Sequence, residues 1–336
     1  MDYSDEASIN PSVIILDGIS GTGKTLLGPL LSQLSDFAPP RFYYPFEWLA
    51  AGLYKDSVDP SFARAWVKLA FDQLAYDSQI SREINFRPGD LSTNFGYGNR
   101  INALRRLWKK DGPHIGELIQ KEGLGITVIT HQIFPTYPKL SSTLDPKILF
   151  IQAVRRPSDL LEHWTSYVDR HGTCTTDFTL SFQSDFGPVP WFLSSDPADY
   201  LSSDTPNKAA ILLCDLFENL FSLKEDSGLS SSILFIPFEE FIISPLTFLD
   251  EISLKVGKQF KPRLQTQMKR EKVPRLLGQE GKRDPAYDRY KIHHEDSRTT
   301  SHGIKLGLLE ALKSPTLSRL KSMDSQYEEL FVPSIS

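Results

Sequence analysis

The feature that most constrains this chain is a glycine-rich segment near its N-terminus, residues 18–25, which reads GISGTGKT. It matches the pattern G-x-x-x-x-G-K-[ST] at every required position. A short apolar run, residues 13–17, precedes it and predicts a strand that is buried on both faces. Leucines at helical spacing follow it. A strand, a glycine turn and a helix in this order predict an α/β fold that binds phosphate groups at the turn.

The residue types of this loop suit the binding of phosphate. Glycines let successive backbone N–H groups turn inward toward an anion, and the following helix presents its positive N-terminal end. Lys24 adds a positive charge, and the hydroxyl of Thr25 is able to bind Mg²⁺. The predicted nucleotide-binding residues of the loop are Gly18, Ser20, Gly21, Thr22, Gly23, Lys24 and Thr25.

Further strand and helix patterns alternate along the chain, which predicts a three-layer α/β/α fold around a mostly parallel sheet. The predicted strands after the loop are residues 126–130, 148–154 and 233–238. The predicted helices cover residues 63–74, 101–110, 209–223 and 245–256, and a further helix follows Pro157.

Two long segments lack such periodicity. Residues 173–205 are rich in Ser, Asp, Thr and Pro, and we interpret them as a lid-like insertion or a plain surface loop. Residues 258–303 predict a long loop over the sheet, and residues 307–330 predict a closing helical segment interrupted at Pro315. Without repeats or a clear linker, residues 1–336 read as a single domain, with a core over about 12–260 and residues 261–336 forming a C-terminal loop and closing helix.

Composition excludes several classes of protein. The formal net charge of −5 argues against a dedicated nucleic-acid binder, which usually has a basic surface. Cys174 and Cys214 form neither a disulfide framework nor a metal-binding spacing. The first ten residues do not form a secretion signal, and no apolar run is long enough to span a membrane. We therefore expect a soluble cytoplasmic protein; its oligomeric state is not readable.

A second group of candidate site residues follows the two strands after the loop. His131 ends the strand at residues 126–130, and Arg155 with Arg156 ends the strand at residues 148–154. Ligands of open α/β sheets collect at the carboxyl ends of the strands. His131 therefore lies where a ligand would bind, and the guanidinium groups of Arg155 and Arg156 are suited to bidentate contact with a phosphate. The alternatives are a structural histidine and surface ion pairs of the arginines.

These residues resemble the sulfotransferase family. Its pattern is a P-loop-like segment, a strand ending in Thr-His with a proline soon after, and a strand ending in Arg-x-Pro-x-Asp. Thr130-His131, Pro135 and Arg155-x-Pro157-x-Asp159 match this order, and the resemblance covers roughly residues 12–260. It implies transfer of a sulfuryl group from 3′-phosphoadenylyl sulfate (PAPS) to a hydroxyl or amine of an unidentified acceptor. His131 would be the general base, Lys24 would stabilise charge, and Arg155 would hold the 3′-phosphate.

A weaker match to the family's cofactor loop at residues 278–283 implies phosphate contacts from Lys282 or Arg283. Two positions depart from the family pattern. Gly21 stands where the family's loop has a Lys or Arg, and His163 stands where it has a serine. From their helical spacing, we expect the side chains of His163 and its neighbours to pack against the rest of the protein or to line the edge of the binding cleft. For Glu47 we expect a capping or surface role rather than acid–base chemistry.

Two other functions stay open from the sequence. One is a kinase or NTPase that binds ATP or GTP through residues 18–25, with Mg²⁺ on Thr25. The other is a nucleotide-binding regulatory protein without turnover. No metal is expected for sulfuryl transfer, so a strict Mg²⁺ requirement would favour the kinase.

Overall fold

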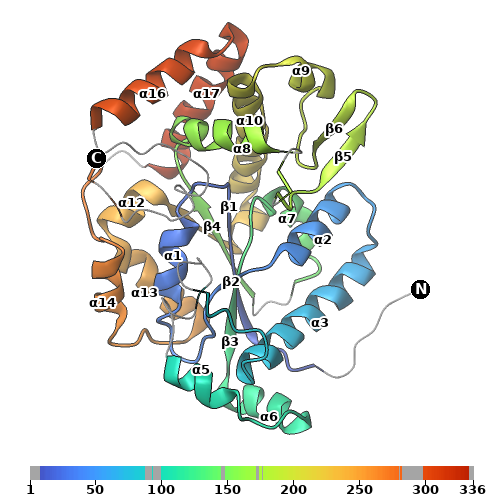
Figure 1. The fold of residues 1–336 in the computed structure, drawn as a ribbon, viewed down its shortest axis with the longest axis vertical. Helices are drawn as coiled ribbons and strands as arrows, with labels where there is room; N and C mark the ends of the chain where they lie inside the picture. Colours follow the sequence, from blue (N-terminus) through green and yellow to red (C-terminus); the bar gives the residue numbers. More distant parts are fainter. Residues whose placement is uncertain are drawn as a thin grey trace.

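A computed structural model of the chain describes residues 8–87, 93, 100–144, 148–171, 174–175, 177–279, 281 and 298–332. Its centre is a parallel sheet of five strands in the order β2-β3-β1-β4-β7 (Figure 1). The strands of this sheet are β1 (Ser12–Gly18), β2 (Arg41–Phe42), β3 (Gly125–Ile129), β4 (Ile148–Val154) and β7 (Ile233–Pro237). A separate antiparallel hairpin consists of β5 (Ser181–Ser184) and β6 (Gly187–Pro190).

Helices cover both faces of the sheet. Alternate residues of a strand point to opposite faces, and in β1 Val13 and Ile15 join one buried cluster while Ile14 and Leu16 join the other. The helices on the first face are α2 (Tyr44–Tyr54), α3 (Pro60–Gln79), α6 (Pro113–Glu122), α7 (Tyr137–Leu140) and α10 (Thr205–Glu225). Those on the second face are α1 (Lys24–Leu31), α12 (Phe238–Ile243), α13 (Pro245–Val256) and α14 (Leu264–Arg270). The predicted three-layer α/β/α fold is therefore confirmed.

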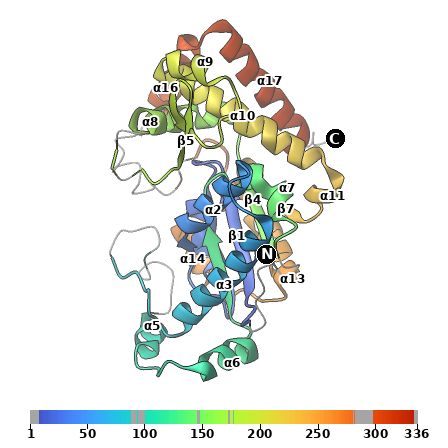
Figure 2. The same ribbon diagram turned by 90° about the vertical axis from the view of Figure 1, so that its right-hand side faces the viewer.

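The remaining helices include those above and below the sheet (Figures 1 and 2). They are η1 (Phe134–Thr136), η2 (Pro157–Leu160), α5 (Arg100–Arg106), α8 (Leu161–Arg170), α9 (Pro197–Ser202), α11 (Ser227–Ser230), α16 (Arg298–Ala311) and α17 (Ser314–Phe331). Helices α8, α9, α16 and α17 gather above the carboxyl ends of the strands, and α5 and α6 lie at the opposite end. Within the described ranges, no helix is both long and apolar enough to cross a bilayer.

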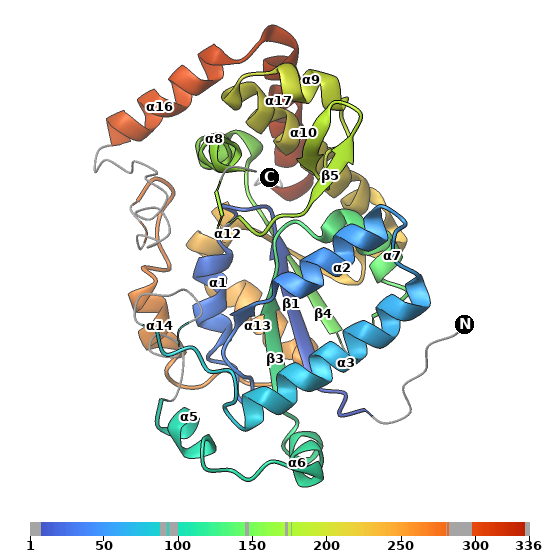
Figure 3. The ribbon, with the colours of Figure 1, turned by 45° about the vertical axis from the view of Figure 1, so that its right-hand side comes forward.

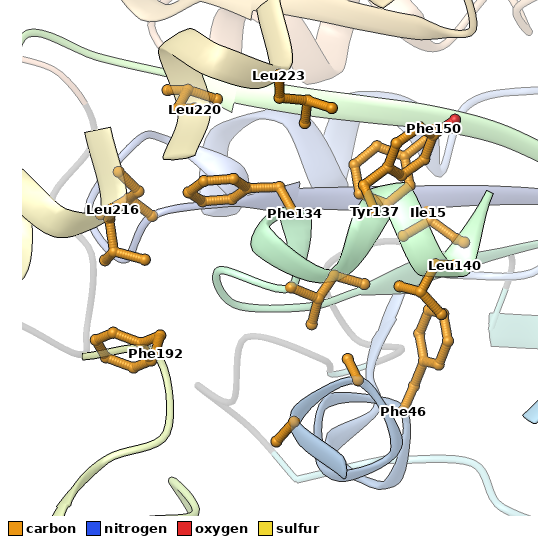
Figure 4. Packing of buried hydrophobic residues seen from close by; sticks show 14 of the residues in the cluster. Ile15, Phe46, Phe134, Tyr137, Leu140, Phe150, Phe192, Leu216, Leu220 and Leu223 are labelled. Atoms are coloured by element: carbon orange, nitrogen blue, oxygen red, sulfur yellow. The ribbon is translucent and has the colours of Figure 1, made fainter. Parts of the chain in front are cut away.

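The segment that follows β3 is anchored in the larger core. Figure 4 shows Phe134 pointing toward α10, and Tyr137 lying beside Phe150 and Ile15 of the sheet. Phe134 is fully buried, and the rings of Tyr137 and Phe150 lie 4.7 Å apart between centroids. Burying one such aromatic side chain contributes about 2 kcal/mol. This packing holds the chain immediately after His131 in place.

Several predicted helices and strands agree with the structure, whereas the loops predicted for residues 173–205 and 258–303 do not. The strand at residues 148–154 and the helix at residues 245–256 are confirmed to the residue. The prediction of a loop over residues 173–205 is wrong, because this segment contains β5, β6 and α9. The loop predicted over residues 258–303 is interrupted by α14 and by the start of α16. The closing segment is two helices, α16 and α17, with Pro315 in the first turn of α17.

Candidate active site

The candidate residues lie at one edge of the sheet, where four neighbouring strands end. After β1 comes the glycine loop, after β3 comes His131, after β4 comes Arg155, and after β7 comes Phe238. Because the strands are parallel, their carboxyl ends share one edge, which is the usual ligand position in open α/β sheets. The glycine loop, His131 and Arg155 therefore lie together at this edge.

The loop conformation requires glycine at its turning points. Gly21 and Gly23 have φ angles of +96° and +94°, in the left-handed region that other residues rarely adopt. A Cβ on Gly23 would also lie 2.6 Å from Cδ2 of Phe238. The hydroxyl of Thr22 donates a hydrogen bond of 2.8 Å to the carbonyl of Ile19. Helix α1 then begins at Lys24, so its N-terminal end faces the loop.

Lys24 is buried against the loop that it follows. Its Nζ donates hydrogen bonds to the carbonyl of Gly18 and, at 3.1 Å, to that of Ile19. Burial lowers the pKa of Lys24 to about 8, although the nearby carboxylates of Asp17 and Glu47 oppose this shift. The amine is therefore mostly cationic at pH 7 and loses its proton within a pH range that is easily measured. Thr25 lies in the first turn of α1 and is partly buried.

Asp17 joins the end of β1 to the segment after β3. The carboxylate is fully buried and accepts hydrogen bonds from the Thr130 hydroxyl at 2.9 Å and from the Phe134 backbone N–H at 3.0 Å. Burial raises its pKa, while the Lys24 cation and the hydrogen bond from Thr130 act in the opposite direction. This bridge places His131, which follows Thr130, beside the glycine loop.

His131 forms a pair with Glu47 of α2. A carboxylate oxygen of Glu47 accepts hydrogen bonds from the backbone N–H of His131 at 3.0 Å and from its Nδ1 at 2.9 Å. With the proton on Nδ1, the neutral imidazole keeps an unprotonated Nε2 that can accept a proton. The rings of Phe42 and Tyr44 stack with the imidazole at centroid distances of 5.3 and 6.1 Å. The expected capping or surface role of Glu47 is wrong, because its carboxylate orients the histidine.

Two arginines flank the aromatic ring that supports the loop. The guanidinium of Arg155 lies 4.5 Å from the centroid of Phe238 and donates a hydrogen bond of 3.2 Å to the carbonyl of Gly21. The guanidinium of Arg275 lies 5.9 Å from the same centroid. Burial and the neighbouring Arg155 lower the pKa of Arg275. Within the described part of the chain, the buried Nε atoms of both arginines have no hydrogen-bond partner.

Helix α8 holds the tip of the loop. Nε2 of His163 lies 2.9 Å from the hydroxyl of Ser20, and Nε1 of Trp164 donates a hydrogen bond of 3.0 Å to the Ser20 carbonyl. A Cβ on Gly21 would lie 3.1 Å from Leu160 and 3.4 Å from the His163 ring. The two positions that depart from the family pattern, Gly21 and His163, therefore lie next to each other. Burial lowers the pKa of His163 to about 3, and the nearby cation of Lys24 adds to this shift.

No protein-family model matches the sequence, and no curated protein matches it. Among solved structures, the chain is similar to the sulfotransferase domain from the curacin biosynthetic pathway, with 11% identity, coverage of 95% of this chain and 98% of that one, and a TM-score of 0.47. The sulfotransferase domain of the Synechococcus PCC 7002 olefin synthase has 14% identity, coverage of 96% and 98%, and a TM-score of 0.40. Mouse sulfotransferase SULT7A1, solved in complex with PAP, has 12% identity, coverage of 98% and 88%, and a TM-score of 0.40. At these values the likenesses do not assign an activity to this chain.

Two residues join the site through contacts that the sequence pattern does not indicate. Glu47 and Arg275 are both distant in sequence from the residues they face, and no motif surrounds them. Phe238 directly follows a predicted strand, so its position at the sheet edge could have been recognised.

Other predicted residues lie outside the site or outside the described residues. Arg156 forms an ion pair with Glu328 at 2.8 Å, and Asp159 pairs with Lys305. Lys282 and Arg283 lie outside the described residues. Gly281, next to them in sequence, packs against the guanidinium of Arg275.

Proposed function

We propose that this protein is a sulfotransferase-like enzyme that transfers a sulfuryl group from PAPS to a hydroxyl or amine of an acceptor. The observation that carries this proposal is the pair of His131 and Glu47 beside the glycine loop, with hydrogen bonds of 3.0 and 2.9 Å. An imidazole that is oriented by a carboxylate is a suitable base for a hydroxyl group. His131 directly follows β3 and Thr130, which agrees with the family pattern of a strand that ends in Thr-His.

The donor nucleotide fits the cationic residues of the site. The loop amides, Lys24 and the N-terminus of α1 would hold the phosphosulfate, and Arg155 with Arg275 would hold a second phosphate. The buried Nε atoms of these arginines, which lack partners among the described residues, are donors suited to such an anion. The donor would supply the sulfuryl group. Residues 1–336 would act as one domain, since α17 packs into the same core as the sheet.

In the proposed transfer, the acceptor oxygen forms a bond to sulfur while the bond from sulfur to the bridging phosphate oxygen breaks. Nε2 of His131 takes the proton of the acceptor. The electron pair of the broken bond stays on the bridging oxygen, where Lys24 and the loop amides stabilise the negative charge. Glu47 keeps the imidazole in the tautomer that this step requires.

The proposal is tested by calorimetric titration of the protein with 3′-phosphoadenosine 5′-phosphate, and separately with ATP and GTP, with and without Mg²⁺. We expect the bisphosphate to bind without metal. We expect the Arg155→Ala variant to bind it at least about tenfold more weakly. Arg156→Ala is the matched control, because Arg156 pairs with Glu328 of α17. Binding of a nucleoside triphosphate alone, and only with Mg²⁺, would instead identify a kinase or NTPase.

A further inference from the structure

Beyond the catalytic pair, a row of exposed apolar side chains runs along α2 and the extended chain next to it. We call Tyr44, Trp48, Phe178, Leu180 and Phe182 the aromatic strip. The last four are 42–52% exposed, which is unusual for four large neighbouring apolar side chains. Figures 2 and 3 show α2 beside β5, the strand that contains Phe182. A contiguous apolar surface of this kind indicates a binding site.

The strip is continuous because the helix and the extended chain contact each other along its length. The rings of Tyr44 and Phe178 lie 5.3 Å apart, and Nε1 of Trp48 donates a hydrogen bond of 3.0 Å to the carbonyl of Phe178. Residues four apart lie on one face of a helix, which places Tyr44 and Trp48 together. Residues two apart lie on one side of an extended chain, which places Phe178, Leu180 and Phe182 together.

The strip has two different ends. At one end, Tyr44 stacks with the imidazole of His131 at 6.1 Å. At the other, the ammonium of Lys55 lies 4.6 Å from the centroid of Phe182 and 5.2 Å from that of Tyr54. Among the residues that the structure describes, no carboxylate forms an ion pair with Lys55. Tyr44 begins α2 and Lys55 directly follows its last residue, so the two are eleven positions apart, which corresponds to about 16 Å along the helix.

We propose that the aromatic strip binds the acceptor, and that the acceptor is an elongated apolar alcohol with an anionic group at the end remote from its hydroxyl. The hydroxyl would lie at His131, the apolar chain along the strip, and the anion at Lys55. This inference rests on the proposed sulfuryl transfer and names the class of molecule that receives the group. Apolar contact supplies affinity, and the two polar ends set the direction in which the molecule lies.

The test is a calorimetric titration with ω-hydroxylaurate, below its critical micelle concentration, in the presence of 3′-phosphoadenosine 5′-phosphate. Lauryl alcohol has the same chain and hydroxyl but no carboxylate, and γ-hydroxybutyrate has both end groups but is too short to span the strip. We expect ω-hydroxylaurate to bind about tenfold more tightly than lauryl alcohol and at least a hundredfold more tightly than γ-hydroxybutyrate.

Two variants test the contribution of the cationic end and that of the apolar surface separately. Lys55→Gln should weaken binding of ω-hydroxylaurate about tenfold and leave lauryl alcohol unchanged. Phe178→Ala with Phe182→Ala should weaken both long ligands about tenfold. The matched controls are Lys255→Gln and Leu254→Ala on α13, on the other face of the sheet, which should change neither affinity. All these side chains are at least partly exposed, so thermal unfolding should confirm that the variants fold.

The outcomes distinguish this inference from the proposed function. If ω-hydroxylaurate binds no more tightly than γ-hydroxybutyrate, or if the strip variants bind it like the wild type, the inference is overturned. That holds even if PAPS-dependent transfer to another acceptor is found. If the strip variants behave as expected but no sulfuryl group is transferred, the strip stands as an amphiphile site and the proposed function fails.

Discussion

The two halves of the candidate site differ in whether their polar groups already have hydrogen-bond partners. In the cationic half, Lys24, Arg155 and Arg275 gather around the loop, and the buried Nε atoms of both arginines have no partner within the described residues. In the imidazole half, Glu47 accepts hydrogen bonds from two N–H groups of His131. The cationic half holds like charges together at an energetic cost that a bound anion would offset. The imidazole half is already complete, so its geometry does not depend on an anion.

This difference assigns separate tasks to the two halves. Substitutions in the imidazole half should reduce the rate of transfer and leave nucleotide affinity unchanged. Substitutions in the cationic half should reduce nucleotide affinity. A variant that reduces the rate of transfer and the nucleotide affinity by the same factor would contradict this division of tasks.

The largest effect is expected for His131→Ala. Without a base at this position, kcat for transfer from PAPS should fall about a thousandfold, while the affinity for 3′-phosphoadenosine 5′-phosphate stays the same. Turnover with a panel of hydroxyl acceptors and calorimetry measure the two quantities. His114→Ala is the control, because His114 is exposed on α6 at the opposite end of the sheet. An unchanged rate in the His131 variant would exclude the proposed role of the pair.

The next largest effect concerns the two arginines that flank Phe238. Arg155→Ala and Arg275→Ala should each weaken binding of 3′-phosphoadenosine 5′-phosphate about thirtyfold, or about 2 kcal/mol. If both contact one phosphate, the double variant should lose less than the sum of the single losses. Calorimetry of the four proteins completes this cycle. Strict additivity would show that the arginines act on separate groups.

A smaller effect should follow the titration of Lys24. Its pKa of about 8 means that the amine is mostly protonated at pH 7 and mostly neutral at pH 9. If its charge holds the nucleotide, affinity should be nearly full at pH 7 and fall about tenfold between pH 7 and pH 9. The Lys24→Met variant should bind weakly at both pH values, without this dependence. A wild-type affinity that stays level over this range would contradict the assignment.

The smallest effect concerns stability and His163, which lies between the two halves. Its pKa of about 3 in the folded protein is below the ordinary value of 6.5, so the unfolded chain binds a proton first as the pH falls. This group therefore reduces stability between pH 6.5 and pH 3. His163→Gln should remove about 1.6 kcal/mol of the loss between pH 6.5 and pH 5, as measured by urea unfolding. Parallel stability curves for the two proteins would refute this.

Sequence reasoning located the parts of the site that belong to strand ends. The apolar run of residues 148–154 is bounded by polar residues, and its end therefore predicts where Arg155 stands. The same holds for Lys24 and His131, because each follows a buried strand. Parallel strands then bring these residues to one edge without any knowledge of side-chain contacts.

The partners of these residues could not be predicted in the same way. Glu47 lies 84 positions from His131, in a helix whose aromatic residues do not form a clear periodic stripe. Arg275 follows the basic segment at residues 269–272, which looks like a solvated surface. The strand β5 differs from the predicted loop: residues 177–183 do alternate between polar and apolar side chains, but the many Ser, Asp, Thr and Pro residues of the surrounding segment favour a loop, and the residues of β5 are largely exposed. In each case the contact depends on how distant segments pack together.

The proximity of Gly21 and His163 affects which amino-acid substitutions this loop can accept in the course of evolution. A side chain at position 21 would have to occupy a left-handed backbone conformation and come within 3.4 Å of the His163 ring. A lysine introduced there alone would be opposed by the histidine, and a serine at position 163 alone would leave the loop tip without the hydrogen bond to Ser20 as it now stands. The two positions therefore form an epistatic pair, in which the effect of one replacement depends on whether the other has already occurred.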